Sequence, residues 1–189
     1  YNGDIMSSLN VNTINEYTGA NGVTIDGVLV KDGSINGLIT MSDQWRLTTS
    51  VTTSIDGVTN WERPDGTLQP AYIGSGMSES SGVWTFPATG IYMVTFSAFG
   101  ALQSSGAVIE IEIETTANNG GAYDKVSAAH LDDSGGTLEA TLICQAFIDV
   151  QDTSNDKVRF NVSKADTINV QGDTNCSWTQ VNFLRLGDT

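Results

Sequence analysis

The feature that most constrains the fold is a run of strict alternation at residues 107–116, A-V-I-E-I-E-I-E-T-T. Isoleucine and glutamate exchange places at every step from Ile109 to Glu114. A helix would spread such residues around its surface, whereas successive side chains of a strand point to opposite faces. The run therefore predicts a β-strand with an inward row of isoleucines and an outward row of glutamates.

Two roles are open for the outward row, which consists of Glu110, Glu112 and Glu114. The three carboxylates could face a basic partner, or they could form the solvated face of a half-buried strand. Charged side chains on one face of an antiparallel strand are usually in contact with water. We therefore expect the solvated face.

The rest of the chain repeats this β pattern. Runs rich in Val, Ile, Thr, Phe and Tyr are separated by Gly, Asn, Asp and Ser, and no stretch has sustained helical periodicity. Short strands at such spacing predict an all-β, two-sheet sandwich. The expected strands are 41–54, 83–86, 91–99, 107–116, 126–131, 137–150, 157–163, 168–170 and 177–186, with long loops at 57–66 and 74–82.

Residues 83–100, V-W-T-F-P-A-T-G-I-Y-M-V-T-F-S-A-F-G, predict a β-hairpin. Pro87 and Gly90 bracket its expected turn, because proline fixes φ and glycine tolerates conformations that a side chain forbids. The second strand carries apolar groups on both faces. Such a strand is buried on both sides, in a sandwich or at a subunit interface.

Three pieces of the chain resemble the C1q/TNF-like jelly roll. They are F-P-A-T-G-I-Y-M-V-T-F-S in the expected hairpin, the strand–acidic turn–strand unit at 148–162, and the closing strand at 177–186. In the last piece the family usually has Phe-Ser-Gly-Phe, whereas this chain has W-T-Q-V. The resemblance implies a jelly-roll head over residues 42–189 that assembles as a homotrimer.

Residues 1–41 differ from the expected head. Very short alternating runs are closed by glycines, and A-N-G-V-T-I-D-G-V-L-V-K-D-G is similar to stem sequences of tailed-phage fibre and structural proteins. Each apolar face is too small to be buried within one chain, so we predict an intertwined trimeric β stem. A disordered or strand-swapped arm is the alternative. The expected oligomerisation residues are Val23, Ile25, Val28, Val30, Ile35 and Leu38.

Charge limits the partners of the chain. Twenty-two acidic residues outnumber eight basic ones, which gives a formal net charge of −14. Such a chain is repelled by nucleic acid and by anionic membranes. No apolar run is long enough to span a bilayer. We therefore expect neither nucleic-acid binding nor membrane insertion.

The sequence predicts no enzyme, no cofactor and no assigned metal site. His130 is the single histidine, and no G-x-S-x-G elbow or Gly-rich phosphate loop occurs. Carboxylates in the turns at 132–133 and 152–156 could offer oxygen ligands to Ca²⁺, but neither turn matches an EF-hand loop. Because C1q-like heads sometimes hold calcium, the resemblance leaves Ca²⁺ open.

Cysteines and tryptophans leave further alternatives. Cys144 and Cys176 could form a disulfide or remain free thiols. Trp61, Trp84 and Trp178 lie in or next to expected turns or strand ends, where exposed rings could stack on the sugars of a receptor glycan. Alternatively, they close the ends of the sandwich or the trimer axis.

A stem followed by a head predicts a non-enzymatic virion protein. We expect a trimeric phage fibre or spike head, extracellular on the virion surface, joined to other virion proteins through its N-terminus. It would bind a host receptor, either a glycan or a surface protein. Alternatives are a capsid decoration or assembly protein, a tailspike glycan-degrading enzyme and a secreted C1q-like signalling ligand. Against the last, collagen G-X-Y repeats are absent.

Overall fold

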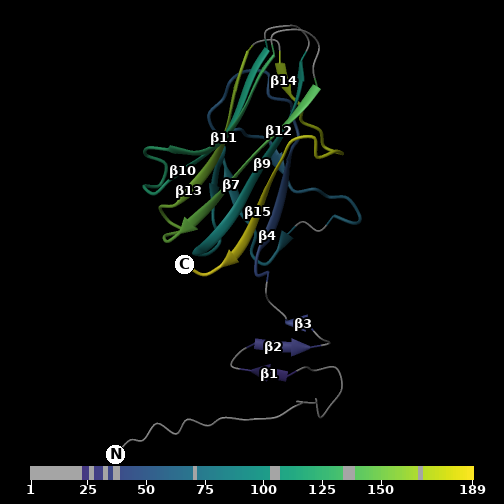
Figure 1. Ribbon diagram of the computed structural model, residues 1–189. Coiled ribbons are helices and arrows are strands. Elements are labelled where there is room, and N and C mark those ends of the chain that lie inside the picture. Colours follow the sequence, from purple (N-terminus) through teal and green to yellow (C-terminus); the bar gives the residue numbers. More distant parts are fainter. Residues whose placement is uncertain are drawn as a thin grey trace, which may run out of the picture. The chain divides into compact units, whose positions relative to one another are not determined.

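A computed structural model describes residues 23–25, 28–31, 34–35, 39–69, 72–102, 107–133, 139–165 and 168–189. These residues form strands and irregular segments only, which confirms the all-β prediction (Figure 1). Within these ranges, no helix is long and apolar enough to cross a membrane. The chain divides into two compact units, Tyr1–Leu38 and Ile39–Thr189.

The N-terminal unit contains a three-stranded antiparallel sheet of β1 (Val23–Ile25), β2 (Val28–Lys31) and β3 (Ser34–Ile35). Its register pairs the expected stem residues with one another, and Leu38 lies outside the described residues. That three chains intertwine here stays a prediction. The pairs are Val23 with Val30, Ile25 with Val28, and Val30 with Ile35.

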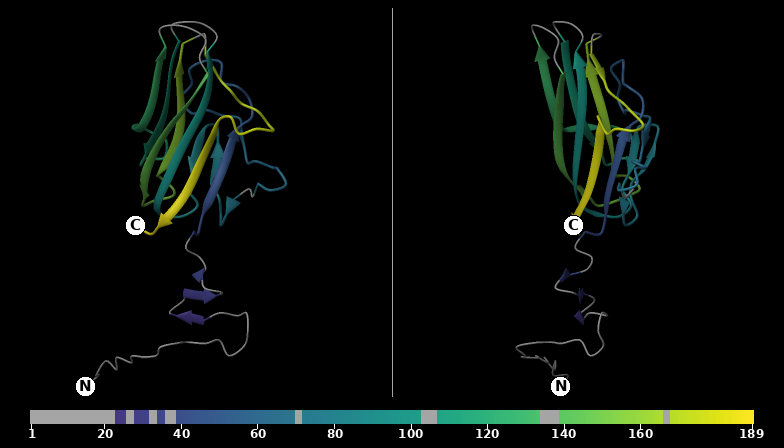
Figure 2. Two further views of the ribbon diagram at one scale, coloured as in Figure 1. Left: turned by 45° about the vertical axis from the view of Figure 1, so that its right-hand side comes forward. Right: turned by 90° about the vertical axis from the view of Figure 1, so that its right-hand side faces the viewer.

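The C-terminal unit, called the head below, consists of two antiparallel sheets. The first sheet has the order β12-β9-β15-β4-β5, with β14 also paired to β9 and β6 to β4; the second has the order β11-β10-β13-β8-β7. The strands are β4 (Ser42–Leu47), β5 (Trp61–Glu62), β6 (Tyr72–Ile73), β7 (Ser78–Ser80), β8 (Val83–Thr85), β9 (Gly90–Leu102), β10 (Ala107–Thr116), β11 (Asp124–Asp133), β12 (Glu139–Val150), β13 (Lys157–Lys164), β14 (Ile168–Val170) and β15 (Gln180–Gly187). Blue β4 and yellow β15 run side by side in both views of Figure 2.

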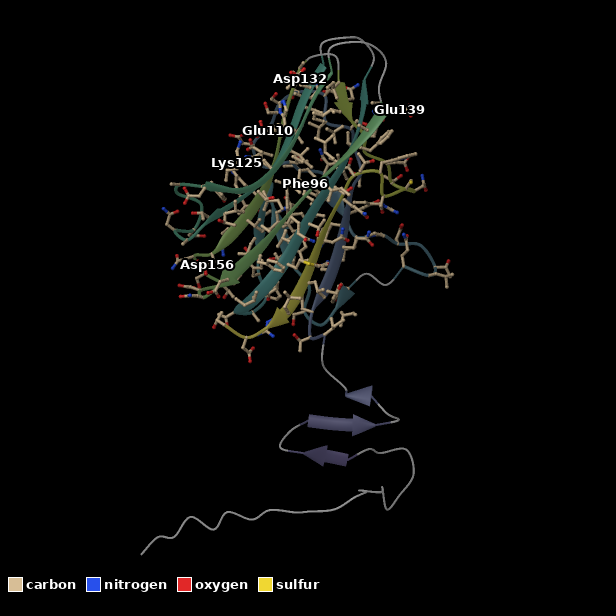
Figure 3. All side chains as sticks on the ribbon, in the orientation of Figure 1. Phe96, Glu110, Lys125, Asp132, Glu139 and Asp156 are labelled. Carbon is tan, nitrogen blue, oxygen red and sulfur yellow. The ribbon has the colours of Figure 1, made fainter. Side chains whose placement is uncertain are left out.

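The hydrophobic core lies between the two sheets. Ile109, Ile111 and Ile113 are buried, so the alternation of β10 is confirmed. Aromatic rings fill the centre, where Phe96 lies 5.2 Å from Phe160 between ring centroids (Figure 3). Aromatic pairs at this separation stabilise a core beyond their buried area. The other central rings belong to Trp61, Trp84 and Phe183.

The expected hairpin at residues 83–100 is wrong. β8 pairs with β7 and β13 in the second sheet, whereas β9 pairs with β12, β14 and β15 in the first. The turn at 87–90 therefore crosses from one sheet to the other. Phe86 and Tyr92 explain the crossing, because both are buried with ring centroids 4.8 Å apart over the end of the core. The Tyr92 hydroxyl donates to the Ala88 carbonyl at 2.9 Å and fixes the turn.

Strand bounds near the first expected strand also differ. β4 ends at Leu47, and the following segment leaves the sheet and makes isolated bridges from Val51 to Val170 and from Ile55 to Val162. The loops expected at 57–66 and 74–82 contain the short strands β5 and β7. Two- and three-residue strands carry too little alternation to be recognised from sequence.

Candidate functional site

The outward face of the first sheet contains a patch of uncharged side chains that the strand register defines. Side chains at even positions of β9 point into the core, so those at odd positions point outward. β9 aligns outward residues of β12 on one side with outward residues of β15 on the other. We call these nine residues the neutral face. Its rows are Phe147–Met93–Leu184, Gln145–Thr95–Asn182 and Ile143–Ser97–Gln180.

The neutral face has the composition of an interface core. None of its nine residues is ionisable, although the whole chain has a formal charge of −14. Phe147 and Ile143 are 68% and 61% exposed, and both belong to β12 at the edge of the sheet. Aromatic residues and methionine are enriched, and charges depleted, at the centre of protein interfaces. A monomer would leave these side chains in water at a cost.

The outward face of the second sheet is charged and internally paired. Lys125 of β11 contacts Glu110 at 2.8 Å and also pairs with Glu112, both on β10. Arg159 of β13 contacts Glu114 at 2.6 Å. Figure 3 shows Glu110 and Lys125 together on the surface. The expected solvated row is therefore only partly correct, because the carboxylates are covered by basic side chains of the same sheet.

The buried Arg46 and the partly exposed Arg63 anchor the segment that connects β5 to β7. We call this segment, residues 62–69 and 72–77, the strap. Arg46 of β4 donates from Nε to Glu62 at 2.8 Å and from Nη2 to Asp65 at 2.7 Å. The hydrogen bond from Arg46 lowers the pKa of the Asp65 carboxyl. The first half of the strap is thereby tied to β4.

The second anchor is a buried ion pair. Arg63 of the strap donates to both carboxylate oxygens of Asp43, at 3.0 and 2.9 Å, and the Asp43 side chain has no exposed surface. The Met77 N–H completes the set with a 2.7 Å bond to Asp43. The Arg63 guanidinium also lies over the rings of Trp45 and Tyr72, at 4.2 and 4.5 Å. Charge pairing and cation–π contacts together fix the strap.

A cleft of about 360 Å³ lies between the strap and the outward face of the first sheet. Gln44 of β4 and Asn182 of β15 form its floor, and Leu68, Gln69 and Tyr72 of the strap form its wall. The sequence analysis did not predict this cleft. One residue could have indicated an unusual contact here. Asp43 alternates with Trp45 and Leu47 and so shares their inward face, where a carboxylate needs a basic partner.

The structure separates the three candidate tryptophans. Trp61 and Trp84 are buried in the core, so their proposed role as exposed sugar-stacking rings is wrong. Trp178 is half exposed and packs on Phe99 with ring centroids 5.0 Å apart. The exposure of each tryptophan side chain depends on the direction in which its strand end faces. The residue type alone does not determine this direction.

Neither cysteine nor histidine forms a nucleophilic site. Cys144 is buried and Cys176 exposed, and both are free thiols, so no disulfide joins them. Burial raises the pKa of Cys144 to about 12, which keeps this thiol protonated and unreactive at neutral pH. The His130 Nδ1 lies 3.9 Å from Glu110 on the exposed side of β11. A catalytic pair would require closer contact.

The two acidic turns lie at opposite ends of the head, as Asp132 and Asp156 show in Figure 3. Among the described residues, no three His, Cys, Asp or Glu side chains converge as metal ligands. In the turn at 152–156, Asp152 accepts hydrogen bonds from Ser154 and Asn155, and Asp156 accepts two from backbone N–H groups. These carboxylates cap their own turn.

No protein-family model and no curated protein matches the sequence. Solved structures do match. The Eiger TNF of S. frugiperda is 13% identical with a TM-score of 0.55, over 78% of this chain and 93% of that one. Murine APRIL is 11% identical with a TM-score of 0.53, over 77% and 98%. At this identity the likeness shows the fold, a TNF-like jelly roll.

Proposed function

We propose that the chain is the head and part of the stem of a homotrimeric virion fibre or spike that attaches to a host surface without catalysis. The observation that carries this proposal is the neutral face. Copies that each carry a charge of −14 repel one another, so an uncharged surface is where they can meet. Closed rings of identical subunits are a common outcome of such contacts.

The stem residues supply a second contact in the same proposal. Five of the six expected residues occur in β1, β2 and β3, and the register makes them neighbours across strands. A three-stranded sheet of two- to four-residue strands is too small to be stable alone in water. Association of three copies would stabilise both units and leave the N-terminal end to join other virion proteins.

Attachment would rely on multivalency. Three weak sites on one rigid trimer raise the apparent affinity by orders of magnitude without any new contact. The charge of −14 suits an extracellular particle surface and disfavours nucleic-acid binding. The buried Cys144 and the exposed His130 support a non-catalytic role.

Two measurements test this proposal. Light scattering on the full chain should give the mass of a trimer, and a monomer would contradict the fibre assembly. The labelled protein should also adsorb to cells of a candidate bacterial host, with and without a chelator. Absence of adsorption in both conditions, together with binding to purified capsids, would favour a decoration protein. Release of sugar from host polysaccharide would favour a tailspike enzyme.

A further inference from the structure

We propose that the cleft between the strap and β4 is a binding site for a neutral saccharide unit. This inference rests on the proposed attachment function and names the class of ligand that one subunit would recognise. The cleft of about 360 Å³ falls within the range of small-molecule sites. Its lining combines amide groups, a hydroxyl and apolar walls, which suit a sugar ring, with Asp43, whose carboxylate is buried and paired with Arg63.

The strap is held in place before any ligand binds. Arg46 and Arg63 tie down its first end through Glu62, Asp65 and the fully buried Asp43, and the Met77 N–H donates to Asp43 at its other end. In contrast, Leu68 between the two anchors is 94% exposed. A loop that is rigidly anchored yet presents an apolar tip to water has the form of a preorganised binding element, because little ordering is lost when a ligand binds.

The polar groups of the cleft match vicinal hydroxyls. Gln69 carries an amide oxygen that accepts and an amide nitrogen that donates, Gln44 adds a second amide whose nitrogen also donates to Gln180, and Ser42 adds a hydroxyl. An amide can donate a hydrogen bond to a sugar hydroxyl and also accept one from it, because a hydroxyl both donates and accepts. Opposite them, the ring of Tyr72 and the side chain of Leu68 offer an apolar surface for the C–H face of a sugar.

Charge selects a neutral ligand over an acidic one. Arg46 and Arg63 are the basic groups beside the cleft, and their guanidinium groups are engaged by Glu62, Asp65 and Asp43. An acidic sugar would therefore meet no available cation in the cleft while facing a chain of net charge −14. Neutral hexoses and N-acetylhexosamines avoid this repulsion.

Saturation-transfer NMR on the full chain tests the site with defined probes. The probes are methyl α-D-glucoside, methyl β-D-galactoside and N-acetyl-D-glucosamine, each at about 20 mM, because a single weak site binds in the millimolar range. At least one probe should receive saturation from the protein. N-acetylneuraminic acid, which is anionic, should receive none. Absence of transfer to all three neutral probes would overturn the proposal, and so would equal transfer to the anionic sugar.

Variants locate the binding. Gln69→Ala and Tyr72→Ala should each weaken binding roughly tenfold, as expected for loss of one hydrogen-bonding or stacking partner. Tyr72→Phe keeps the ring and should retain binding. Gln151→Ala is the matched control, since it removes an exposed amide of the head that lies outside both the cleft and the neutral face. Unchanged binding in the two alanine variants would overturn the assignment.

Two further results separate this inference from the attachment function. If the wild type adsorbs to host cells and the cleft variants adsorb equally well, attachment stands and the saccharide site is wrong. If sugars bind in the cleft but the wild type does not adsorb, attachment is wrong and the site stands. A change of solution mass in Gln69→Ala would identify the cleft as a contact with a second copy and would overturn the saccharide assignment.

Discussion

The two sheets of the head bury similar inward faces but differ on their outward faces. The second sheet pairs its outward carboxylates with Lys125 and Arg159 of its own strands. The first sheet has no ionisable group across the nine residues of the neutral face. A solvated face tolerates charge, whereas a face that other copies cover cannot hold unpaired charges without a large desolvation cost. This difference supports the proposal that the first sheet is the one that contacts other copies.

Glu139 and Asp149 of β12 and Arg185 of β15 carry charge on the first sheet but lie outside the neutral face, and the remaining charges are on the β4 side. Asp43 points inward and is buried, and Arg46 is covered by Glu62 and Asp65 of the strap. These ions are therefore satisfied within one chain and leave the neutral face clear. The second sheet pairs carboxylates with basic side chains along its outward face, whereas Asp43 and Arg46 of the first sheet anchor a loop.

The largest effect is expected from a charge on the neutral face. Phe147→Glu would place one carboxylate per subunit in the contact between copies, and each buried unpaired charge costs roughly 3–5 kcal/mol. Light scattering should then report a monomer. Val126→Glu is the control, because Val126 is also an exposed apolar residue but lies on β11 of the second sheet. If the trimer persists in Phe147→Glu, or dissociates equally in both variants, the proposed difference between the outward faces of the two sheets would be contradicted.

A second large effect is expected at the buried pair. Asp43→Ala leaves the Arg63 guanidinium and the Met77 N–H without their acceptor, so the free energy of unfolding should fall by roughly 3–5 kcal/mol. Denaturant titration measures this change. Asp56→Ala removes an exposed carboxylate 3.8 Å from Arg159 of the second sheet and should change stability by less than about 0.5 kcal/mol. Equal losses would show that burial does not distinguish the two sheets' ion pairs.

A smaller effect is expected where the chain crosses between the sheets. Gly90 has φ +139°, and an added Cβ would lie 2.4 Å from the Gly187 carbonyl oxygen. Gly90→Ala should therefore destabilise the head by roughly 1–3 kcal/mol, as judged by thermal unfolding. Gly120→Ala is the matched control, since Gly120 has φ +92° but its nearest contact is the Tyr123 hydroxyl at 3.6 Å. If Gly120→Ala lowers the thermal stability as much as Gly90→Ala does, the effect is due to the positive φ alone and not to the close contact with Gly187.

The smallest effect is expected on the charged face. The hydrogen bond from Lys125 lowers the pKa of Glu110 below its ordinary value of 4.5. A lowered carboxyl pKa contributes stability above pH 4.5, and this contribution is lost as the pH falls through the lowered pKa. Solvent screening limits it to about 1 kcal/mol or less. Glu110→Gln should remove this part of the acid dependence of the unfolding free energy, and high salt should weaken it in the wild type.

Glu112→Gln removes the neighbouring carboxylate, which also pairs with Lys125, and provides the comparison for Glu110→Gln. An acid dependence that is unchanged in Glu110→Gln would contradict a role for this ion pair in the pH response of the second sheet.

Sequence patterns predicted elements better than their partners. The strands at 168–170 and 107–116 match β14 and β10, because alternation and turn residues are local properties. The crossing at residues 87–90 was missed, since a strand–turn–strand pattern is the same whether the strands pair in one sheet or separate into two. The cleft was missed for the same reason: Gln69 and Asn182 are brought together only by the fold.

The sequence by itself determined the fold class, the inward rows of the long strands and the acidic charge that limits the partners. These follow from side-chain alternation and composition, which need no knowledge of distant contacts. The tertiary structure decided which tryptophans are exposed, which residues form the neutral face and where Arg46 and Arg63 hold the strap. Those features depend on strand order and on pairs such as Asp43 with Arg63, whose contact across twenty residues exists only in the folded chain.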